Sequence, residues 1–401
     1  MDVFVARQPI FDTQLNTFGY ELLFRNSLNN FFPDIDGDTA SSTVLSNSFF
    51  CIGLEKLTSG KKAFVNFTRD LLLKKIPGLF PLTSLYAEIL ETIEPDVELI
   101  SVISQMFQKG CHFALDDFIF HEKFEPFIHY ADIIKIDIQQ TPLDEAKFLI
   151  DKLEGKPIKY LAEKVETREE YSQAIDAGFS YFQGYFFSKP EILTQKSIAP
   201  SQVQLLRLIG ELNREETDIN RLENIVKADV SISYRLLQYM NSAYFNLPNK
   251  VVSIKGAILF LGLIEVRKIV SLFAMTKLFE SKPNELLRTS VIRAKLCEIV
   301  GKANGYHGDP SELFLLGLFS LMDVILGTKI ESVVDQLPLS EQLKTALISG
   351  EGELGKILAM VCDYEKGNWD DNLMSKKELI DNNLKIENYI EAITWTDSLI
   401  N

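Results

Sequence analysis

Short apolar segments of strand character alternate with helical patterns throughout the first half of the chain. The helical patterns, for example residues 94–110 and 169–178, carry apolar residues at helical spacing and end in glycine, a common C-terminal signal. Six segments rich in β-branched and aromatic residues are predicted as buried strands: AFVNF (63–67), LYAEI (85–89), HFALD (112–116), IIKID (133–137), IKYLAE (158–163) and YFQGY (181–185). Repeated alternation of this kind predicts a mostly parallel sheet, either open or closed into a barrel.

The character of the chain changes near residue 195. Beyond this point strand signals fade, and helical patterns follow one another over residues 222–243, 256–279 and 290–305. Pro190 and Pro200 bracket the change. We therefore predict two domains, an α/β barrel-like domain over residues 1–195 and an all-helical domain over residues 196–401.

Composition narrows the classes of partner. The formal net charge of −15 argues against broad binding of nucleic acid polymers, which needs a positive surface. The apolar stretch AILFLGLI is closed by Glu265 and is too short to span a membrane. No segment resembles a secretory signal, and four scattered cysteines form no CxxC pair, which suits buried thiols in a reducing compartment. We expect a soluble, cytoplasmic protein.

Polar residues recur near the C-terminal ends of the predicted strands, roughly 20–30 residues apart, about one strand–helix unit each. The series comprises Asn66, Glu88, Asp116, Asp117, Lys135, Asp137, Glu163 and Gln183. In a barrel, this spacing would bring the side chains together at the C-terminal rim, where active sites of the fold lie. Burying one such carboxylate would cost several kcal/mol unless it is paired or bound to a metal.

The chemistry of this series suits a hard divalent cation. Several carboxylates with an amide oxygen favour Mg²⁺, Mn²⁺ or Ca²⁺ over zinc. Adjacent carboxylates such as Asp116 and Asp117 can serve two ions, an arrangement that cleaves phosphodiesters. A plainer interpretation is that individual members cap helices or lie in loops, and Asp116 and Asp117 could simply cap the next helix.

Residues 1–195 also resemble the EAL domain, a TIM-like barrel phosphodiesterase that hydrolyses cyclic di-GMP. YELLFR (20–25) resembles the signature segment, with Glu21 as its glutamate, Arg25 as the phosphate-contacting arginine and Leu22 in place of the usual alanine. The other motifs follow in the expected order: VNF with Asn66, AEILE with Glu88 and Glu91, ALDDF, KID, AEKVET and QGYFFSKP.

The resemblance implies a role for each matching residue. Glu21, Asn66, Glu88 and Asp116 would hold one Mg²⁺ or Mn²⁺ ion, and Asp116, Asp117 and Asp137 would serve a second. The remaining roles are Lys135 to orient the attacking water, Glu163 as general base or water-positioning ligand, Arg25 to offset phosphate charge, Gln183 at the substrate edge and Glu91 to brace the following loop. The implied reaction is in-line attack of a metal-activated water on one phosphodiester, which opens the ring to linear pGpG.

The chain departs from the family pattern after the aspartate pair. Active relatives continue roughly as DDFGTGYSS, whereas this chain reads DDFIFHEKFEPF, with bulky Ile119 and Phe120 where small residues allow close approach to metal and substrate. Lys164 replaces the glycine after Glu163, where it could pair with Glu163 or fill the space of a guanine base. Three outcomes stay open: a slow enzyme, a cyclic di-GMP receptor, or a barrel without ligand. The departures favour reduced or absent turnover.

The C-terminal half resembles the HDOD domain, a helical relative of HD-type phosphohydrolases. The matching segments are LENIVKADVSISYRLLQYMNSAYF, with Asp229 and Asn241–Ser242, and SIKGAILFLGLIEVRKIV. The His–Asp dyad of catalytic relatives is replaced by Ser320 and Leu321, which excludes a phosphohydrolase built on several histidines. We interpret His307 as an exposed turn residue and Asn241–Ser242 as a structural cap or turn.

Together the two halves resemble the EAL–HDOD bacterial signalling proteins of the YuxH type. The resemblance implies a cyclic di-GMP signalling protein that is a weak or inactive phosphodiesterase, acting as a cyclic di-GMP receptor or as a scaffold for an unknown signalling protein through its HDOD domain. The alternative is an active Mg²⁺- or Mn²⁺-dependent phosphodiesterase that produces pGpG, and a barrel enzyme acting on another phosphodiester is a third reading. A homodimer is compatible with either of the first two.

Overall fold

The computed structural model describes residues 4–25, 53–153, 155–186, 200–212, 218–242, 244–245, 247–278, 283–335, 337, 339–367 and 386–400. The chain divides into two compact units, Met1–Lys189 with Tyr364–Asn368, and Pro190–Asp363 with Trp369–Asn401. The predicted boundary between residues 195 and 196 lies outside the described residues, so it stays a prediction.

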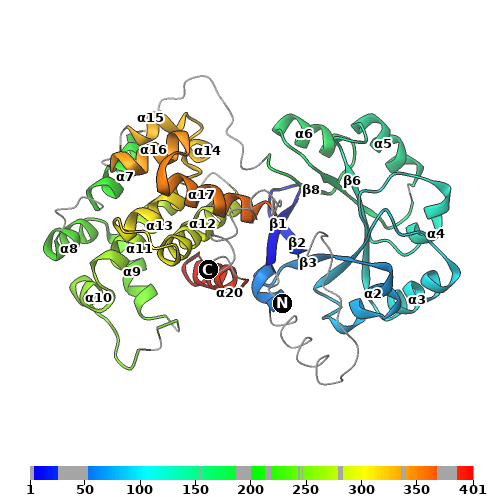
Figure 1. Ribbon diagram of the computed structural model, residues 1–401, viewed down its shortest axis with the longest axis horizontal. Helices are drawn as coiled ribbons and strands as arrows, with labels where there is room; N and C mark the ends of the chain where they lie inside the picture. Colours follow the sequence, from blue (N-terminus) through cyan, green and yellow to red (C-terminus); the bar gives the residue numbers. More distant parts are fainter. Residues whose placement is uncertain are drawn as a thin grey trace. The chain divides into compact units, whose positions relative to one another are not determined.

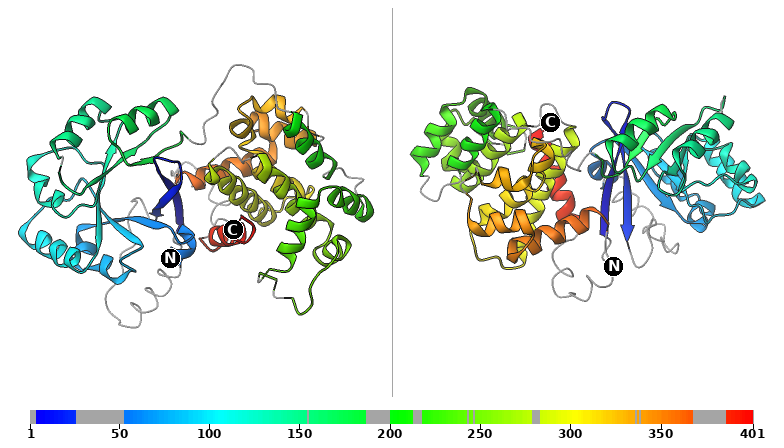
Figure 2. Two further views of the ribbon diagram at one scale, coloured as in Figure 1. Left: turned by 180° about the vertical axis from the view of Figure 1, so that it is seen from behind. Right: turned by 90° about the horizontal axis from the view of Figure 1, so that it is seen from above.

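The first unit is a closed eight-stranded barrel in the order β1 to β8, which confirms the predicted barrel class (Figure 1). Its strands are β1 (Phe4–Asp12), β2 (Thr17–Arg25), β3 (Lys62–Phe67), β4 (Leu85–Ile89), β5 (His112–Leu115), β6 (Ile133–Asp137), β7 (Lys159–Glu163) and β8 (Tyr181–Gln183). The six strands expected from the sequence correspond to β3 through β8. The hairpin of β1 and β2 was not expected, and β1 runs antiparallel to both its neighbours (Figure 2).

Helices surround the strands on the outside of the barrel (Figure 1). They are α2 (Arg69–Leu73), α3 (Val97–Gln108), α4 (Glu125–Ile128), α5 (Leu143–Lys152) and α6 (Arg168–Asp176), with the 3₁₀ turns η1 (Ile76–Leu79) and η2 (Glu122–Phe124). Helix α6 begins with a full capping box, in which the Thr167 hydroxyl accepts from the Glu170 amide and the Glu170 carboxylate accepts from the Thr167 amide. The capping box therefore fixes the residue at which the loop after β7 ends and helix α6 begins.

Side-chain alternation separates the barrel interior into an apolar layer and a polar layer. The apolar layer is a buried cluster of Ile10, Phe64, Ala114, Ile133 and Leu161. For the apolar-layer residues of β3, β5, β6 and β7, the residue two positions later in the chain is polar; for β5 this residue directly follows the strand. Because side chains two apart on a strand share a face, these polar residues also point into the barrel, one layer nearer its C-terminal mouth.

The regular secondary structure in the described part of the second unit is all helical, as predicted. Its elements are α7 (Pro200–Leu212), α8 (Ile219–Lys227), α9 (Val230–Met240), α10 (Ile254–Leu261), α11 (Leu263–Leu278), α12 (Asn284–Ala303), α13 (Pro310–Phe319), α14 (Met322–Leu326), α15 (Ile330–Val334), α16 (Glu341–Ser349), α17 (Gly352–Glu365) and α20 (Ile386–Ile400). Helix α11 is buried nearly all round, and α12 crosses α13 so closely that a Cβ on Gly317 would lie 2.5 Å from the Cα of Ala294.

Two residues that the sequence interpretation singled out lie beside helices of this unit. Asn241 ends α9 and ties it to the next loop, since its side chain donates to the Leu237 and Val251 carbonyls and accepts from the Val251 amide, which confirms the cap interpretation. His307 is exposed between α12 and α13, as expected. None of the helices in the described part of the chain is both long and apolar enough to cross a membrane.

Asp229 offers a stability test of this unit. It caps α9 by accepting from the Ile232 amide, and its other oxygen lies 2.8 Å from the Lys277 Nζ. Burial would raise its pKa, but the hydrogen bonds from Lys277 and the backbone outweigh this and lower it. A lowered pKa means that the stabilisation is present above about pH 4 and lost as the pH falls below it.

We expect Asp229→Ala to lower the free energy of unfolding at pH 7 by about 1–2 kcal/mol, from loss of the cap and the ion pair. Asp218→Ala is the matched control, because Asp218 caps α8 through the Arg221 amide. Urea unfolding at pH 7 and at pH 3 would measure both variants. Equal losses in the two variants at pH 7 would contradict a contribution from Lys277.

Candidate functional site

A lysine lies at the centre of the polar layer of the barrel. Lys135, in the middle of β6, is completely buried. Its ammonium contacts four carboxylates that come from different parts of the barrel wall. The Nζ lies 2.6 Å from Glu88, 2.6 Å from Asp116, 3.0 Å from Glu163 and 3.3 Å from Glu21.

Strand register explains why these residues meet. Asn66 on β3 pairs with Glu88 on β4, and Asp137 on β6 pairs with Glu163 on β7. Glu21 reaches the same layer from β2, and Asp116 directly follows β5. The convergence predicted at one end of the barrel is therefore observed for this set, from residues that are up to 142 positions apart in the chain (163 minus 21).

The cluster carries more negative than positive charge. Four carboxylates surround one ammonium, and burial raises the pKa values of Glu88 and Glu163 well above their ordinary range. Burial also opposes the charge on Lys135, but the surrounding carboxylates outweigh it and hold the pKa of Lys135 well above its ordinary value. Such a cluster is stabilised by any additional cation that reaches its oxygens.

Several buried oxygen atoms in this layer have no hydrogen-bond donor. They are Asn66 Oδ1, Glu88 Oε2, Glu163 Oε2 and Gln183 Oε1. A buried acceptor without a partner costs about 1–3 kcal/mol, and carboxylate and amide oxygens are the ligands that Mg²⁺, Mn²⁺ and Ca²⁺ prefer. The residues therefore fit a hard divalent cation by their chemistry. The carboxylates turn toward Lys135, and no group of three or more His, Cys, Asp or Glu residues in the described ranges is arranged as a ligand set.

Two amide side chains complete the layer beside Glu21. Gln183, at the end of β8, donates through Nε2 to Glu21 Oε2 at 2.7 Å and to Gln8 Oε1 at 3.0 Å. Gln8 was not predicted as a site residue, because it lies on β1, which the apolar pattern does not reveal. In the structure it lies directly opposite Glu21 in the β1–β2 register.

Asp137 has a different set of partners from the other acidic residues. It accepts hydrogen bonds from the Gln139 amide at 2.8 Å, from Gln140 Nε2 at 2.9 Å and from Lys164 Nζ at 2.5 Å. Lys164 therefore pairs with Asp137 rather than with Glu163, the partner considered from the sequence. Burial would raise the pKa of Asp137, but Lys164 and the other donors lower it.

The aspartate pair leads into the loop that departs from the family pattern. The Asp117 backbone is left-handed (φ +42°), and burial together with Asp116 raises the pKa of its carboxyl. The residue that caps the next helical turn is His121, whose ring accepts from the Lys123 amide. The interpretation of Asp116 or Asp117 as a cap for that turn is therefore wrong.

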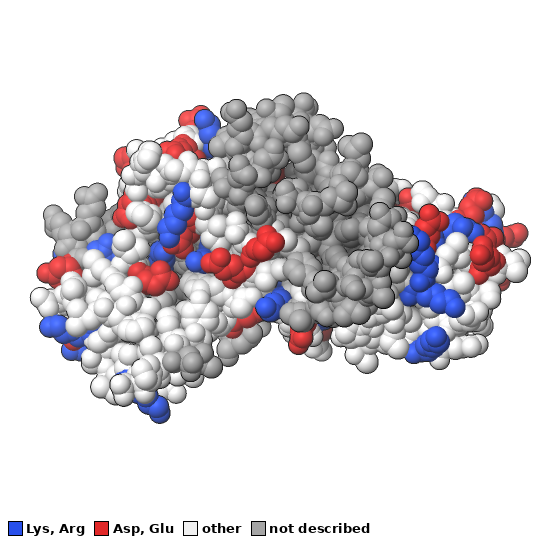
Figure 3. Space-filling model, turned by 60° about the horizontal axis from the view of Figure 1, so that its bottom comes forward, with Lys and Arg blue, Asp and Glu red and all other residues white. Residues whose placement is uncertain are grey.

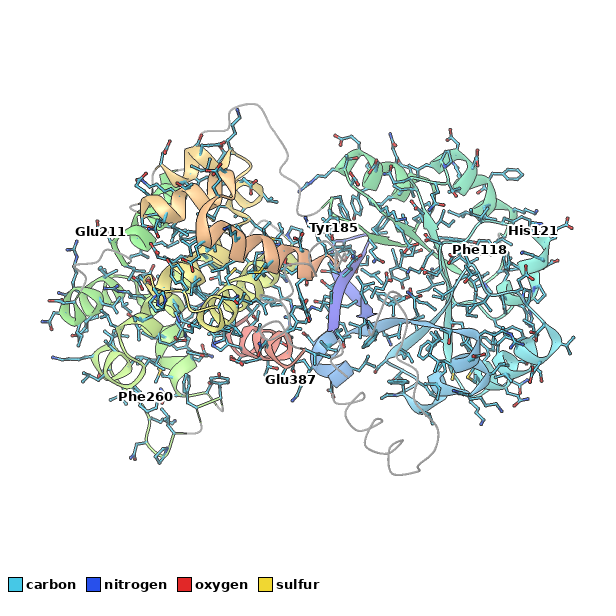
Figure 4. The ribbon with its side chains drawn as sticks, viewed as in Figure 1. Phe118, His121, Tyr185, Glu211, Phe260 and Glu387 are labelled. Atoms are coloured by element: carbon cyan, nitrogen blue, oxygen red, sulfur yellow. The ribbon has the colours of Figure 1, made fainter. Side chains whose placement is uncertain are left out.

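Bulky side chains hold this loop on the outside of the barrel. Phe118 is buried and packs edge-to-face on Phe124, whereas His121 is exposed (Figure 4). The Lys152 ammonium of α5 lies 3.7 Å from the centroid of the Phe120 ring. These contacts anchor the loop, and Phe120 is one of the bulky residues that replace the small ones of active relatives.

The structure leaves the roles of two predicted site residues untested. Glu91 is exposed in the loop after β4, where it lines a small apolar hollow with Asp116 and Phe118. Arg25 ends β2, and its side chain lies outside the described part of the structure. The bracing role of Glu91 and the phosphate contact of Arg25 both stay predictions.

In the second unit, Ser320 and Leu321 take the place of the catalytic dyad and have structural contacts. Ser320 accepts a hydrogen bond from Arg293 Nη1 at 2.8 Å and donates to the Gly317 carbonyl, and Leu321 is buried.

On the described part of the face in Figure 3, Lys and Arg side chains are interspersed with Asp and Glu.

Comparison with known proteins identifies two domain families in the chain. The EAL domain matches residues 56–190 and the HDOD domain matches residues 199–346. The uncharacterized protein YuxH of Bacillus subtilis is 37% identical, covering 100% of this chain and 99% of its own. The cyclic di-GMP phosphodiesterase CdgJ of Vibrio cholerae is 37% identical, covering 91% of this chain and 85% of its own.

Solved structures also resemble the first half. A standalone EAL protein from Vibrio cholerae O395, in a form bound to cyclic di-GMP, is 25% identical, with a TM-score of 0.34. It covers 47% of this chain and 92% of its own.

Proposed function

Because the chain belongs to the family of two-domain EAL–HDOD proteins, we propose that it is a cyclic di-GMP signalling protein. Its barrel would bind the dinucleotide together with a divalent ion and would hydrolyse it slowly or not at all. The observation that carries this proposal is the cluster around Lys135. It retains the predicted ligand residues in one layer and leaves buried oxygens of Asn66, Glu88 and Glu163 without donors. Those oxygens support divalent-ion binding.

The ligand roles follow from this cluster. Glu21, Asn66, Glu88 and Asp116 would hold one Mg²⁺ or Mn²⁺ ion, and Asp116, Asp117 and Asp137 are the residues available to a second. A bound divalent ion would polarise the phosphodiester and ease loss of a proton from the attacking water. Glu163 would take up a proton at Oε2, which has no donor in the structure. Lys135 would orient the attacking water.

Reduced turnover is supported by two features of the chain. The Lys164 ammonium engages Asp137, one of the carboxylates available to a second ion. The loop after Asp117 carries bulky Ile119 and Phe120 where active relatives have small residues, and the Phe120 ring is held by the Lys152 ammonium. Both features would disturb a two-ion arrangement.

An active phosphodiesterase is the second candidate. It is favoured by the 37% identity to CdgJ, the relative named as a cyclic di-GMP phosphodiesterase, together with retention of Glu163 and Lys135. In either case we propose that the helical unit passes the signal on through protein contacts. The replacement of the dyad by Ser320 and Leu321 supports that role over a second hydrolase.

The test is calorimetric titration of the full chain with cyclic di-GMP in Ca²⁺, followed by chromatographic assay for pGpG in Mn²⁺. We expect saturable binding that requires the divalent ion, and turnover at least about 100-fold below the roughly 10 s⁻¹ typical of enzymes. Asn66→Leu should weaken binding, because the buried amide oxygen is lost, whereas Asn224→Leu on the exposed surface of α8 should not. Absence of binding would remove the proposal, and rapid pGpG formation would establish the alternative.

A further inference from the structure

Lys164 has a backbone conformation that lysine rarely adopts. It follows β7 with φ +55°, in the left-handed region, which costs an L-residue more than it costs glycine. Neighbouring contacts impose this conformation. The amide of Val165 donates to the Gln183 carbonyl, and the Phe186 amide donates to the Val165 carbonyl, so the turn after β7 is fastened to the end of β8.

The backbone of this turn is also packed tightly against Gly184, the residue that follows β8. A Cβ added to Gly184 would lie 2.0 Å from the Val165 carbonyl oxygen. Residue 164 is therefore held where glycine would be the relaxed choice, yet the chain carries lysine there. A strained residue that persists in such a position points to a function for its side chain.

The Lys164 side chain reaches into the acidic end of the site. Its Nζ lies 2.5 Å from Asp137 Oδ2, an oxygen on a side chain that is 4% exposed, while the lysine side chain itself is 54% exposed. Asp117 and Glu163 are its other acidic electrostatic neighbours. The ammonium thus enters from solvent and sits among carboxylates at the outer edge of the cluster, whereas Lys135 occupies the inner part.

We propose that the Lys164 ammonium is a built-in cation that replaces the second of two divalent ions, so that the barrel takes up one divalent ion per chain. This inference rests on the proposed function, because it concerns the same site. Asp137 accepts from Lys164, Gln139 and Gln140, and these three donors use most of its acceptor capacity, which makes it a poor ligand. An ammonium ion and a divalent cation also repel each other when both are placed beside the same carboxylates.

A site with one divalent ion and one fixed ammonium can still bind a phosphodiester, because both cations attract its oxygens. It lacks the pair of ions about 4 Å apart that stabilises the attacking and the leaving oxygen together. With Lys164 in place, the site would therefore bind the dinucleotide but hydrolyse it slowly or not at all.

The experiment measures the number of Mn²⁺ ions bound per full-length chain, by equilibrium dialysis with metal analysis. We expect one ion for the wild type and two for Lys164→Gly. Lys164→Arg should keep the stoichiometry at one, because it retains the positive charge. Electron paramagnetic resonance adds a second readout, since two neighbouring Mn²⁺ ions in Lys164→Gly should broaden each other's signal.

Lys75→Gly is the matched control. Lys75 is also left-handed (φ +57°) and exposed, and its ammonium bonds to Gln105 rather than to a carboxylate. The variant loses the same charge and relieves the same kind of backbone strain, and it should still bind one ion. Thermal unfolding of both glycine variants would establish that they fold.

Two ions in the wild type, or an unchanged number in Lys164→Gly, would overturn the proposal, and so would absence of binding in both. The titration with cyclic di-GMP in Ca²⁺ is a separate measurement. Binding of the dinucleotide with an unchanged ion count in Lys164→Gly would refute the role of Lys164 and leave the proposed function standing. Absence of dinucleotide binding by the wild type would refute the proposed function itself.

Discussion

Lys135→Met is expected to lower the free energy of unfolding of the metal-free protein by about 3–5 kcal/mol, because removal of one partner leaves buried charges without compensation. Lys135 is completely buried and contacts Glu21, Glu88, Asp116 and Glu163. Methionine has a similar length and keeps the packing, but it cannot balance the carboxylates. They must then be protonated in the folded state, at a cost that grows as the pH rises above their ordinary pKa values near 4.

Urea unfolding in EDTA at pH 5 and pH 8 would measure this effect, and the loss should be greater at pH 8. Lys159→Met is the matched control, because Lys159 begins β7 and is exposed, and its replacement should change the free energy of unfolding by less than about 0.5 kcal/mol. Addition of Mn²⁺ should restore part of the stability of Lys135→Met, since the carboxylates gain another cation. A loss in Lys135→Met no greater than that of the control would show that Lys135 does not hold the cluster together.

Glu88→Gln is expected to reduce the affinity for Mn²⁺ by about 100-fold or more, since even residues behind the ligands change metal affinity by 10–100-fold. The same variant should be more stable than the wild type when metal is removed. Glu88 is fully buried, and burial raises its pKa well above the ordinary value, so ionisation above about pH 5 costs stability that glutamine does not lose. The gain should be present at pH 8 and absent at pH 4.

The measurement is the melting temperature at both pH values, with EDTA and with Mn²⁺. Glu145→Gln, on the exposed surface of α5, is the control and should retain the wild-type shift with Mn²⁺. In EDTA the melting temperature of Glu88→Gln should be higher than that of the wild type. Addition of Mn²⁺ should raise it much less than it raises that of the wild type. An unchanged response to Mn²⁺ in Glu88→Gln would show that Glu88 is not a ligand.

Much of the barrel could be predicted from local patterns. Strands β4 and β6 coincide with the segments LYAEI and IIKID, because short runs rich in β-branched and aromatic residues favour a buried strand. The β1–β2 hairpin could not be recognised in this way. Its polar residues Arg7 and Gln8 interrupt the apolar pattern, and each is accommodated by partners distant in the chain, such as the Leu57 carbonyl for Arg7.

The candidate site was predictable as a set of residues but not as a set of contacts. Spacing by strand–helix units placed Glu88, Lys135 and Glu163 at one end of a barrel, and the structure brings them together. That spacing contains no information on which cation each carboxylate faces. The central position of Lys135 and the pairing of Lys164 with Asp137 depend on strand register and on a left-handed turn.

The sequence by itself determined the two-part architecture and the residues that line the mouth of the barrel, because periodicity and strand-end position are properties of neighbouring residues. Only the tertiary structure decided how the charges are shared, since Coulomb interactions depend on distances of a few ångströms between side chains that are far apart in the chain. Lys135 therefore neutralises the interior of the cluster, and Lys164 reaches its outer edge from a turn that the end of β8 holds in place.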